Sequence, residues 1–193
     1  MKALILNGER NNENLLCTAE EIVCNELSLA EWQADIVHLR EKKIAACMGC
    51  FNCWMKSPGI CAIDDFGRDV ARMTVRSDLI IFLTPITFGG YSSELKKAVD
   101  RFACSMLLPF FIKINGEVHH KPRYNPLPDL IGIGMLPSQD DESERIFRTL
   151  VERNAINLHS RLSQSEVFYE SQDPESMAKE VRSLLKNIRE KRI

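Results

Sequence analysis

The residues with the clearest capacity for chemistry in this sequence are four cysteines that lie close together in the segment CMGCFNCWMKSPGIC. Three thiols at x2 spacing can converge on one soft metal centre, and Pro58-Gly59 can turn the chain so that a fourth thiol completes the set. Four thiolates suit an iron–sulfur cluster or a zinc ion, although the final x7 step is looser than in bacterial ferredoxins. A loop of small thiols without metal is the alternative interpretation. The four residues are Cys47, Cys50, Cys53 and Cys61.

The remaining cysteines and a pair of histidines give weaker signals. Cys17, Cys24 and Cys104 fall on expected helices and are interpreted as packing residues. His119 and His120 are adjacent on an expected hairpin, so their side chains point to opposite faces and are poorly placed to chelate together. We expect them on the hairpin surface or at a subunit contact.

Composition limits the classes of protein that this sequence can encode. The chain has 193 residues, of which 45% are hydrophobic and 27% charged, with a formal net charge of -2. These values predict one domain spanning residues 1–193, and they give no basic field for nucleic acid and no polybasic membrane footprint. An odd number of cysteines and a start (MKALILNG) unlike a signal peptide predict a reducing, cytoplasmic location.

Strand-like and helix-like segments alternate along the chain, and these elements must position the cysteines and the loops. Short apolar runs predict strands at residues 3–6, 35–39, 78–86, 130–136 and 166–169. Helical periodicity follows at residues 15–30, 92–102, 146–158 and 177–188. Ser92 and Ser93 precede the second of these helices as capping residues. The alternation predicts a doubly wound α/β sheet with right-handed crossovers.

Two insertions interrupt this alternation. One is the cysteine-rich loop, about residues 41–65, and the other covers about residues 107–128. Within the second, Asn115-Gly116 has the composition of a type I′ turn, with strand-forming residues on both sides. The sequence therefore predicts a β-hairpin there.

Ligands of open α/β sheets bind beyond the carboxyl ends of the strands, which directs attention to three loops. The first, NGERNNEN, leads into a helix whose free N–H groups form a natural phosphate site. It contains neither a dinucleotide glycine fingerprint nor a Walker sequence, so an ordinary polar turn is an equal alternative. The third loop, residues 136–139, could cover another flank of the same ligand.

The second loop lies in TPITFGGYSSELKKAVDR, where Pro85 and two glycines predict a tight backbone. Thr87, Phe88 and Tyr91 offer a stacking surface and hydroxyl groups to a planar cofactor, although packing of the two rings against the next helix is the alternative. The charged residues that follow are interpreted as a solvated helix face with local ion pairs. They are Lys96, Lys97, Asp100 and Arg101.

Three stretches together resemble the flavodoxin-like NAD(P)H-dependent FMN reductase family, in particular its cysteine-bearing branch, the iron–sulfur flavoproteins. They are MKALILNG, CMGCFNCW…GICAIDDFG and TPITFGGYSSELKKAVDR. The resemblance implies a five-stranded parallel sheet, FMN with its phosphate at the first loop and its ring along the second, and a homodimer or homotetramer with the flavin near a subunit interface. The cofactor-binding residues that it implies are Asn7, Glu9, Arg10, Asn14, Leu15, Pro85, Ile86, Thr87, Phe88, Gly89, Gly90 and Tyr91.

The phosphate loop departs from the pattern of that family. Its members place hydroxyl residues in a Gly-Ser-x-Arg…Asn-Thr pattern, whereas this chain has Glu9 and Leu15 at the serine and threonine positions. A carboxylate ~4 Å from a phosphate costs about 4 kcal/mol per charge pair at an effective dielectric constant of ~20. Arg10 could offset part of this repulsion, and Glu9 could rotate into water. We therefore expect FMN to bind weakly.

Three functional hypotheses follow. The leading one is an FMN-dependent oxidoreductase that passes electrons from NAD(P)H to a small-molecule or protein acceptor, with a [4Fe–4S] cluster on the four clustered cysteines as a one-electron relay. It requires no side-chain acid, base or nucleophile. The second is an electron carrier or binding protein with an altered flavin pocket and no turnover of its own. The third is a zinc-stabilised loop on a redox-inactive scaffold.

Overall fold

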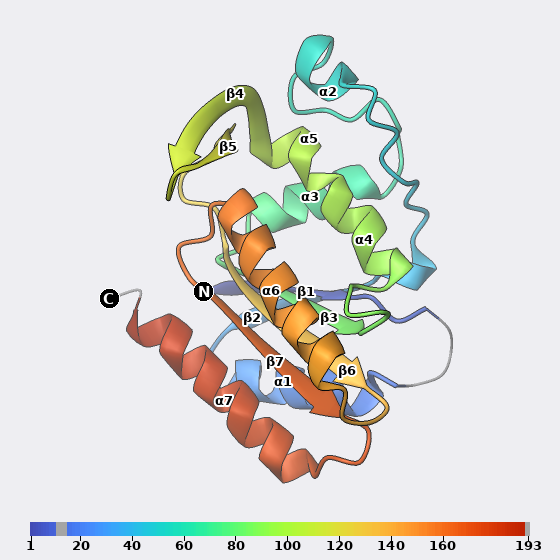
Figure 1. Ribbon diagram of the computed structural model, residues 1–193, viewed down its shortest axis with the longest axis vertical. Coiled ribbons are helices and arrows are strands. Elements are labelled where there is room, and N and C mark those ends of the chain that lie inside the picture. The colour runs from blue at the N-terminus through green and yellow to red at the C-terminus, as the bar shows by residue number, and fades with distance from the viewer. Residues whose placement is uncertain (11–14, 192–193) are drawn as a thin grey trace.

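A parallel β-sheet forms the centre of the protein in the computed structural model, which describes residues 1–10 and 15–191. Five strands lie in the order β2-β1-β3-β6-β7, and each neighbouring pair is parallel (Figure 1). This arrangement confirms the predicted doubly wound α/β fold. The strands are β1 (Lys2–Asn7), β2 (Gln33–His38), β3 (Leu79–Pro85), β6 (Asp129–Leu136) and β7 (Ser163–Tyr169).

Helices cover both faces of the sheet (Figure 1). Alternate residues of β1 show the two layers, because Ile5 packs with the helices α1 (Cys17–Leu29) and α7 (Pro174–Glu190). Leu4 packs in the second core cluster. The helices on that other face are α3 (Gly67–Val75), α4 (Ser93–Asp100), α5 (Phe102–Met106) and α6 (Asp141–Asn157). Strand β3 is apolar on both faces because it lies between these layers.

Local sequence signals explain where several helices begin. The Ser92 side chain accepts a hydrogen bond from the backbone N–H of Leu95, which confirms the predicted cap of α4. Asp140 and Asp173 cap α6 and α7 in the same way. Helix α3, which follows the cysteine-rich loop, was not predicted from the sequence. None of the described helices is long and apolar enough to cross a lipid bilayer.

The second insertion forms the predicted hairpin. Strands β4 (Leu107–Ile114) and β5 (Glu117–Pro122) are antiparallel. Asn115 and Gly116 between them have φ angles of 51° and 85°, as a type I′ turn requires. In the first insertion, a 3-10 helix η1 (Leu39–Glu41) and a short helix α2 (Asn52–Met55) flank the first cysteines. Figure 1 shows this loop and the hairpin side by side, beyond α5.

Candidate functional site

A tight turn stands at the carboxyl end of β3, where the ring of a planar cofactor is predicted. Thr87 and Gly90 exchange two backbone hydrogen bonds of 2.9 and 3.0 Å, and the turn places Phe88 and Gly89 at its tip with φ angles of 50° and 75°. A Cβ atom on Gly89 would lie 2.7 Å from Ile146, so glycine is required by space as well as by φ. The Phe88 side chain is 98% exposed and therefore free to stack.

Two residues of this predicted loop, Ile86 and Tyr91, are buried in the protein. Tyr91 is buried between Phe82 and Phe147, and its hydroxyl accepts a hydrogen bond from Asn154. Burial raises the pKa of Tyr91 above its ordinary value, which keeps the phenol neutral. Ile86 is also buried, and its N–H donates to the carbonyl of Met135 on the neighbouring strand. Packing against the core is thus the observed role of Tyr91.

The first loop contains a buried carboxylate, that of Glu9. Glu9 is only 7% exposed, and its Oε2 accepts a hydrogen bond of 2.9 Å from Arg40 Nη1. Its Oε1 lies 3.4 Å from the backbone nitrogen of Leu16, directly before α1. The expectation that Glu9 turns into water is wrong, because Arg40 holds the carboxylate inward. Arg10 is exposed, and the predicted contact of Asn14 lies outside the described residues.

Three polar residues beside the first loop were missed by sequence reasoning. Glu20 on α1 accepts a hydrogen bond of 2.6 Å from Asn7 and lies 2.9 Å from His38 Nε2. Asn7 also accepts the backbone N–H of Glu9 through its Oδ1. Glu20, His38 and Arg40 meet this loop because β1 and β2 are parallel neighbours with Asn7 opposite His38. The strand pairing, read together with these polar strand ends, is the signal that could have revealed them.

FMN is the cofactor that the sequence resemblance implies, and the described residues fit its two ends unequally. The exposed ring of Phe88 on a rigid turn suits the flat isoalloxazine. The amino end of α1, where a phosphate is expected, already has the Glu9 carboxylate against it. Leu15 lines an open hollow of about 540 Å³ at the same edge of the sheet. The chain therefore suits the flavin ring better than the phosphate.

The clustered cysteines share one small cavity. Cys47, Cys50, Cys53 and Cys61 all line a space of about 80 Å³, together with Cys104 from α5. All seven cysteines of the chain carry free thiols. Their chemistry suits a soft metal centre, but among the described residues no three candidate ligands lie close enough to hold an ion.

Cys104 has a second role besides packing. It is buried, as predicted, and it also lines the cavity that Cys53 lines. Burial raises the pKa of both thiols, so these two sulfurs are neutral in the absence of a metal. Sequence spacing could not have placed Cys104 here, because it lies on a helix far along the chain.

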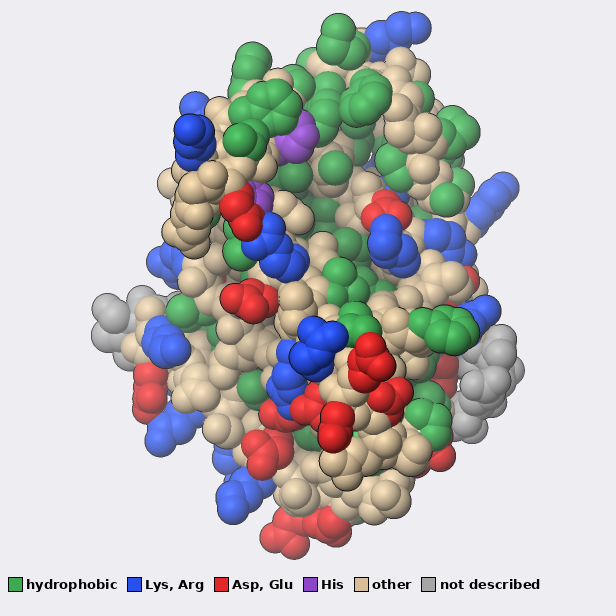
Figure 2. All heavy atoms as spheres, in the orientation of Figure 1, with side chains coloured by type: hydrophobic (Ala, Val, Ile, Leu, Met, Phe, Trp, Pro, Cys, Tyr) green, Lys and Arg blue, Asp and Glu red, His purple; other side chains and the backbone are tan. Residues whose placement is uncertain are grey.

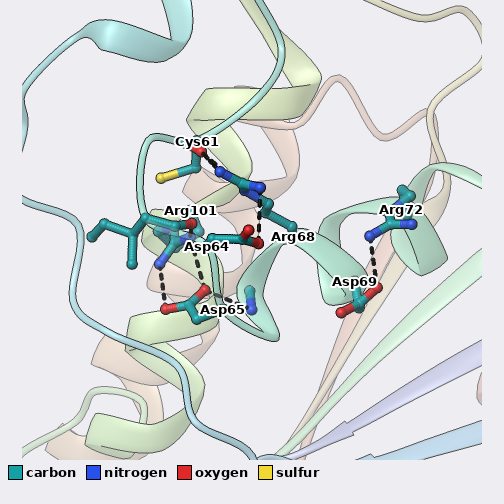
Figure 3. Close-up of polar contacts among 9 residues, drawn as sticks. Cys61, Asp64, Asp65, Arg68, Asp69, Arg72 and Arg101 are labelled. Carbon is teal, nitrogen blue, oxygen red and sulfur yellow. Dashed lines mark hydrogen bonds and ion pairs between the residues drawn. The ribbon is translucent and has the colours of Figure 1, made fainter. Parts of the chain in front are cut away.

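A buried ion pair closes the base of the cysteine loop (Figure 3). Arg101 and Asp65 have side chains that are 2% and 4% exposed, and two hydrogen bonds of 3.0 and 3.1 Å join them. Arg101 also donates to the carbonyls of Ala45 and Ile63, so it binds both ends of the loop. The interpretation of Arg101 as part of a solvated helix face is wrong. For Lys96, which pairs with Asp100 at the surface, it is confirmed.

The carboxylate of this pair stays ionised. Burial pushes the pKa of Asp65 upward, but hydrogen bonds from Arg101 and from the backbone N–H groups of Ala45 and Gly67 outweigh it. The net pKa of Asp65 lies below its ordinary value, which means that the folded state holds the charged form.

Aromatic rings connect the cysteine loop to the hairpin. Trp54 on α2 donates its indole N–H to the carbonyls of Ala103 and Leu107, at 3.2 and 3.1 Å. The ring of His120 lies 4.6 Å from that of Trp54. His119 points away from it toward α6, where its Nδ1 lies 3.0 Å from the side chain of Asn157. The two side chains therefore point to opposite faces, as predicted, but His119 is buried rather than on the hairpin surface.

The sheet order, the crossovers and the loops at the carboxyl edge define a flavodoxin-like α/β protein. The sequence model of the family described as NADPH-dependent FMN reductase matches residues 1–124, and the chain belongs to that family.

Relatives by sequence are iron–sulfur flavoproteins. One from Archaeoglobus fulgidus is 32% identical over 101 residues, which cover 52% of this chain and 48% of that protein. One from Methanocaldococcus jannaschii is 28% identical over 101 residues, covering 52% and 51%. The chain spans about half the length of the curated relatives that it matches.

Solved structures share the fold at low sequence identity. An NAD(P)H:quinone oxidoreductase from Methanothermobacter marburgensis has a TM-score of 0.73 at 12% identity, with 98% of this chain and 97% of that chain covered. An FMN-dependent NADH-azoreductase from Bacillus anthracis in complex with FMN has a TM-score of 0.66 at 12% identity, covering 97% and 99%.

Proposed function

We propose that this protein is an FMN-dependent oxidoreductase that takes a hydride from NAD(P)H and passes electrons to a small-molecule or protein acceptor. Membership of the FMN reductase family supports the flavin chemistry. The observation that carries the proposal is the rigid turn with an exposed Phe88 at the carboxyl end of β3. When bound, FMN supplies both the hydride acceptor and the electron donor.

In this proposal the residues of this chain bind and orient the flavin, and none of them transfers a proton. Phe88 offers a stacking surface, and the two backbone hydrogen bonds between Thr87 and Gly90 fix where that surface stands. Asn7 orders the first loop by accepting the N–H of Glu9. No side-chain acid or base is required, because the electrons move through the cofactor.

For the cysteine loop we propose a [4Fe–4S] cluster on Cys47, Cys50, Cys53 and Cys61, acting as a one-electron relay. Two observations support it: the four thiols line one cavity, and the relatives by sequence are named iron–sulfur flavoproteins. Closing around a cluster requires the loop to draw these thiols together. A zinc ion is the competing occupant, and iron, sulfide and zinc analysis of anaerobically purified protein distinguishes the two.

For the assembly we propose a homodimer or homotetramer in a reducing, cytoplasmic compartment. Figure 2 shows apolar side chains gathered over α2 and the hairpin, and Phe51, Phe110, Phe111 and Val118 there are 59–68% exposed. Such a patch is typical of an interface. Seven free thiols fit a reducing environment. Light scattering after size exclusion reports the oligomeric state.

The test of the proposed function is NAD(P)H oxidation by anaerobically purified protein reconstituted with FMN, with quinone, ferricyanide and azo dye as acceptors. We expect turnover that depends on added FMN. Phe88→Ala should weaken FMN binding, as measured by quenching of flavin fluorescence. Leu29→Ala, an equally simple loss of an exposed apolar side chain on α1, should not. Flavin binding without oxidation of NADH or NADPH would favour an electron carrier instead.

The second candidate, a carrier or binding protein without turnover, is favoured by one observation. The Glu9 carboxylate lies against the amino end of α1, which opposes a phosphate there. If this reading holds, protein purified anaerobically contains little FMN, and added FMN binds without supporting NAD(P)H oxidation.

A further inference from the structure

A cavity of about 330 Å³ lies under the cysteine loop, between α3 and α5. Its volume falls in the range of small-molecule sites. Its lining includes none of the residues predicted to bind FMN, and it shares Cys61, Arg101 and Cys104 with the cysteine cavity. The cavity is thus a separate space next to the loop.

The charged residues on the cavity wall are all positive. Arg68, Arg72 and Arg101 line it, and no aspartate or glutamate is among the described residues that do so. Their carboxylate partners are not among the residues that line the cavity. Figure 3 shows the pairs that Arg68 and Arg72 on α3 form with Asp64 and Asp69. An anion inside the cavity would therefore meet guanidinium groups without meeting a carboxylate.

Two of these arginines can turn toward a ligand at small cost. Arg68 pairs with Asp64, whose side chain is 83% exposed, and Arg72 pairs with Asp69 with side chains 64% and 47% exposed. Exposed pairs of this kind contribute only about 0–1 kcal/mol, so exchanging such a carboxylate for that of a ligand loses little. Arg68 also donates two hydrogen bonds to the carbonyl of Cys61, which keeps its side chain at the cavity.

Buried donors inside the lining lack partners. Arg101 is 98% buried and uses its two Nη groups on Asp65 and on backbone carbonyls, yet its Nε has no hydrogen-bond partner. The Ser105 hydroxyl, also on the lining, has none either. Unpaired buried polar groups are rare and costly, so an acceptor oxygen that reached this inner wall would be stabilised. Both atoms are covered by neighbouring atoms, so contact with a ligand oxygen requires a small shift of the lining.

The rest of the wall is apolar. Ile60, Ala71 and Val75 contribute aliphatic surface, and Tyr124 contributes an aromatic ring. The buried side chain of Cys104 adds to it. The ligand that complements this wall has a flat apolar body and one anionic group.

We propose that this cavity is a binding site for a small aromatic carboxylate, held by Arg68 and Arg72 and completed by the unpaired donors of Arg101 and Ser105. The site does not rest on the proposed flavin chemistry, because its lining is independent of the FMN edge. Its position beside Cys61 places such a ligand against the cysteine loop.

The test is isothermal titration calorimetry of the whole chain with 2-naphthoate, against the neutral 2-naphthalenemethanol. We expect the carboxylate to bind at least about tenfold more tightly than the alcohol, a difference of ~1.4 kcal/mol. The double variant Arg68→Gln/Arg72→Gln should lose at least about tenfold in affinity for 2-naphthoate, because charge-assisted hydrogen bonds are removed. Ser105→Ala should weaken binding less.

The control is Arg153→Gln, which removes an exposed arginine that pairs with Glu117 on the hairpin. This variant should bind 2-naphthoate as the unmodified protein does, and circular dichroism confirms that each variant is folded. Equal affinity for the carboxylate and the alcohol would overturn the proposal. So would binding that persists unchanged in a folded Arg68→Gln/Arg72→Gln variant, or no binding at millimolar ligand.

Discussion

Replacing Arg101 with methionine removes the guanidinium that closes the base of the cysteine loop. The pair with Asp65 is buried, with side chains 2% and 4% exposed, and four hydrogen bonds of Arg101 reach Asp65, Ala45 and Ile63. Breaking a buried pair by deleting one partner costs about 3–5 kcal/mol, because the remaining charge is left uncompensated. Two carbonyls also lose their donors, at roughly 1 kcal/mol each, a loss that overlaps with the first. We expect a total loss of about 4 kcal/mol.

Urea unfolding followed by circular dichroism measures this loss. With a slope of about 2 kcal/mol per molar urea, the midpoint of Arg101→Met should fall by about 2 M. The matched control is Arg72→Gln, which breaks the exposed pair with Asp69 on the neighbouring helix and should change the free energy of unfolding by less than about 1 kcal/mol. Replacing both partners, as Arg101→Met/Asp65→Leu, should recover part of the loss because no charge stays buried.

The effect of pH on this pair has a definite sign. The pKa of Asp65 is lower in the folded than in the unfolded state, so its stabilisation is present above its ordinary value of 3.8 and is lost as the pH falls through the depressed pKa. The gap between the unmodified protein and Arg101→Met should therefore narrow in strong acid. If Arg101→Met lowered the free energy of unfolding by less than about 1 kcal/mol at neutral pH, the reasoning would be refuted, because deleting one partner of a buried ion pair is strongly destabilising.

Three further predictions concern single contacts. Gly89→Ala should lower the free energy of unfolding in urea by about 3 kcal/mol, because a clash with α6 adds to the strain of positive φ. Gly116→Ala, which has open space around its Cβ position, should lower it by about 1 kcal/mol. Equal losses in the two variants would contradict the clash. Trp54→Phe should lose about 1 kcal/mol with its two hydrogen bonds, and an unchanged midpoint would contradict that. Glu144 raises the pKa of Tyr169 to about 12, so Glu144→Gln should move one phenol down toward 10 in a spectrophotometric titration. If the pKa values of all three tyrosines stayed unchanged, this prediction would be contradicted.

Elements with strong local signals were predictable from sequence. The run DLIIFLTPI is apolar at nearly every position, as expected of a strand that is covered on both faces, and β3 is such a strand. Asn115-Gly116 specifies its turn because both residues tolerate positive φ. Ser92 specifies a helix start because its hydroxyl replaces a missing backbone acceptor.

The partners of buried charges were not predictable, because they depend on contacts between distant segments. Arg101 stands among charged residues in the sequence and looks solvated, yet Asp65, 36 positions away, holds it in the interior. Glu9 looks like an obstacle facing a ligand, and only the pairing of β1 with β2 brings Arg40 to it. In both cases the charged residue is visible in the sequence, but where its side chain points and what it pairs with depend on the tertiary structure.

The ion pair at the base of the cysteine loop also makes the loop a separable module. Ala45 and Asp65 are tied directly, since the backbone N–H of Ala45 donates to the Asp65 carboxylate at 2.8 Å. The two ends of the insertion are therefore fixed to each other and to α4, whatever lies between them. Because closing a longer or shorter loop over fixed ends changes the free energy only slowly with length, we expect that segments of other lengths and other metal-binding spacings can be exchanged here while the sheet stays intact.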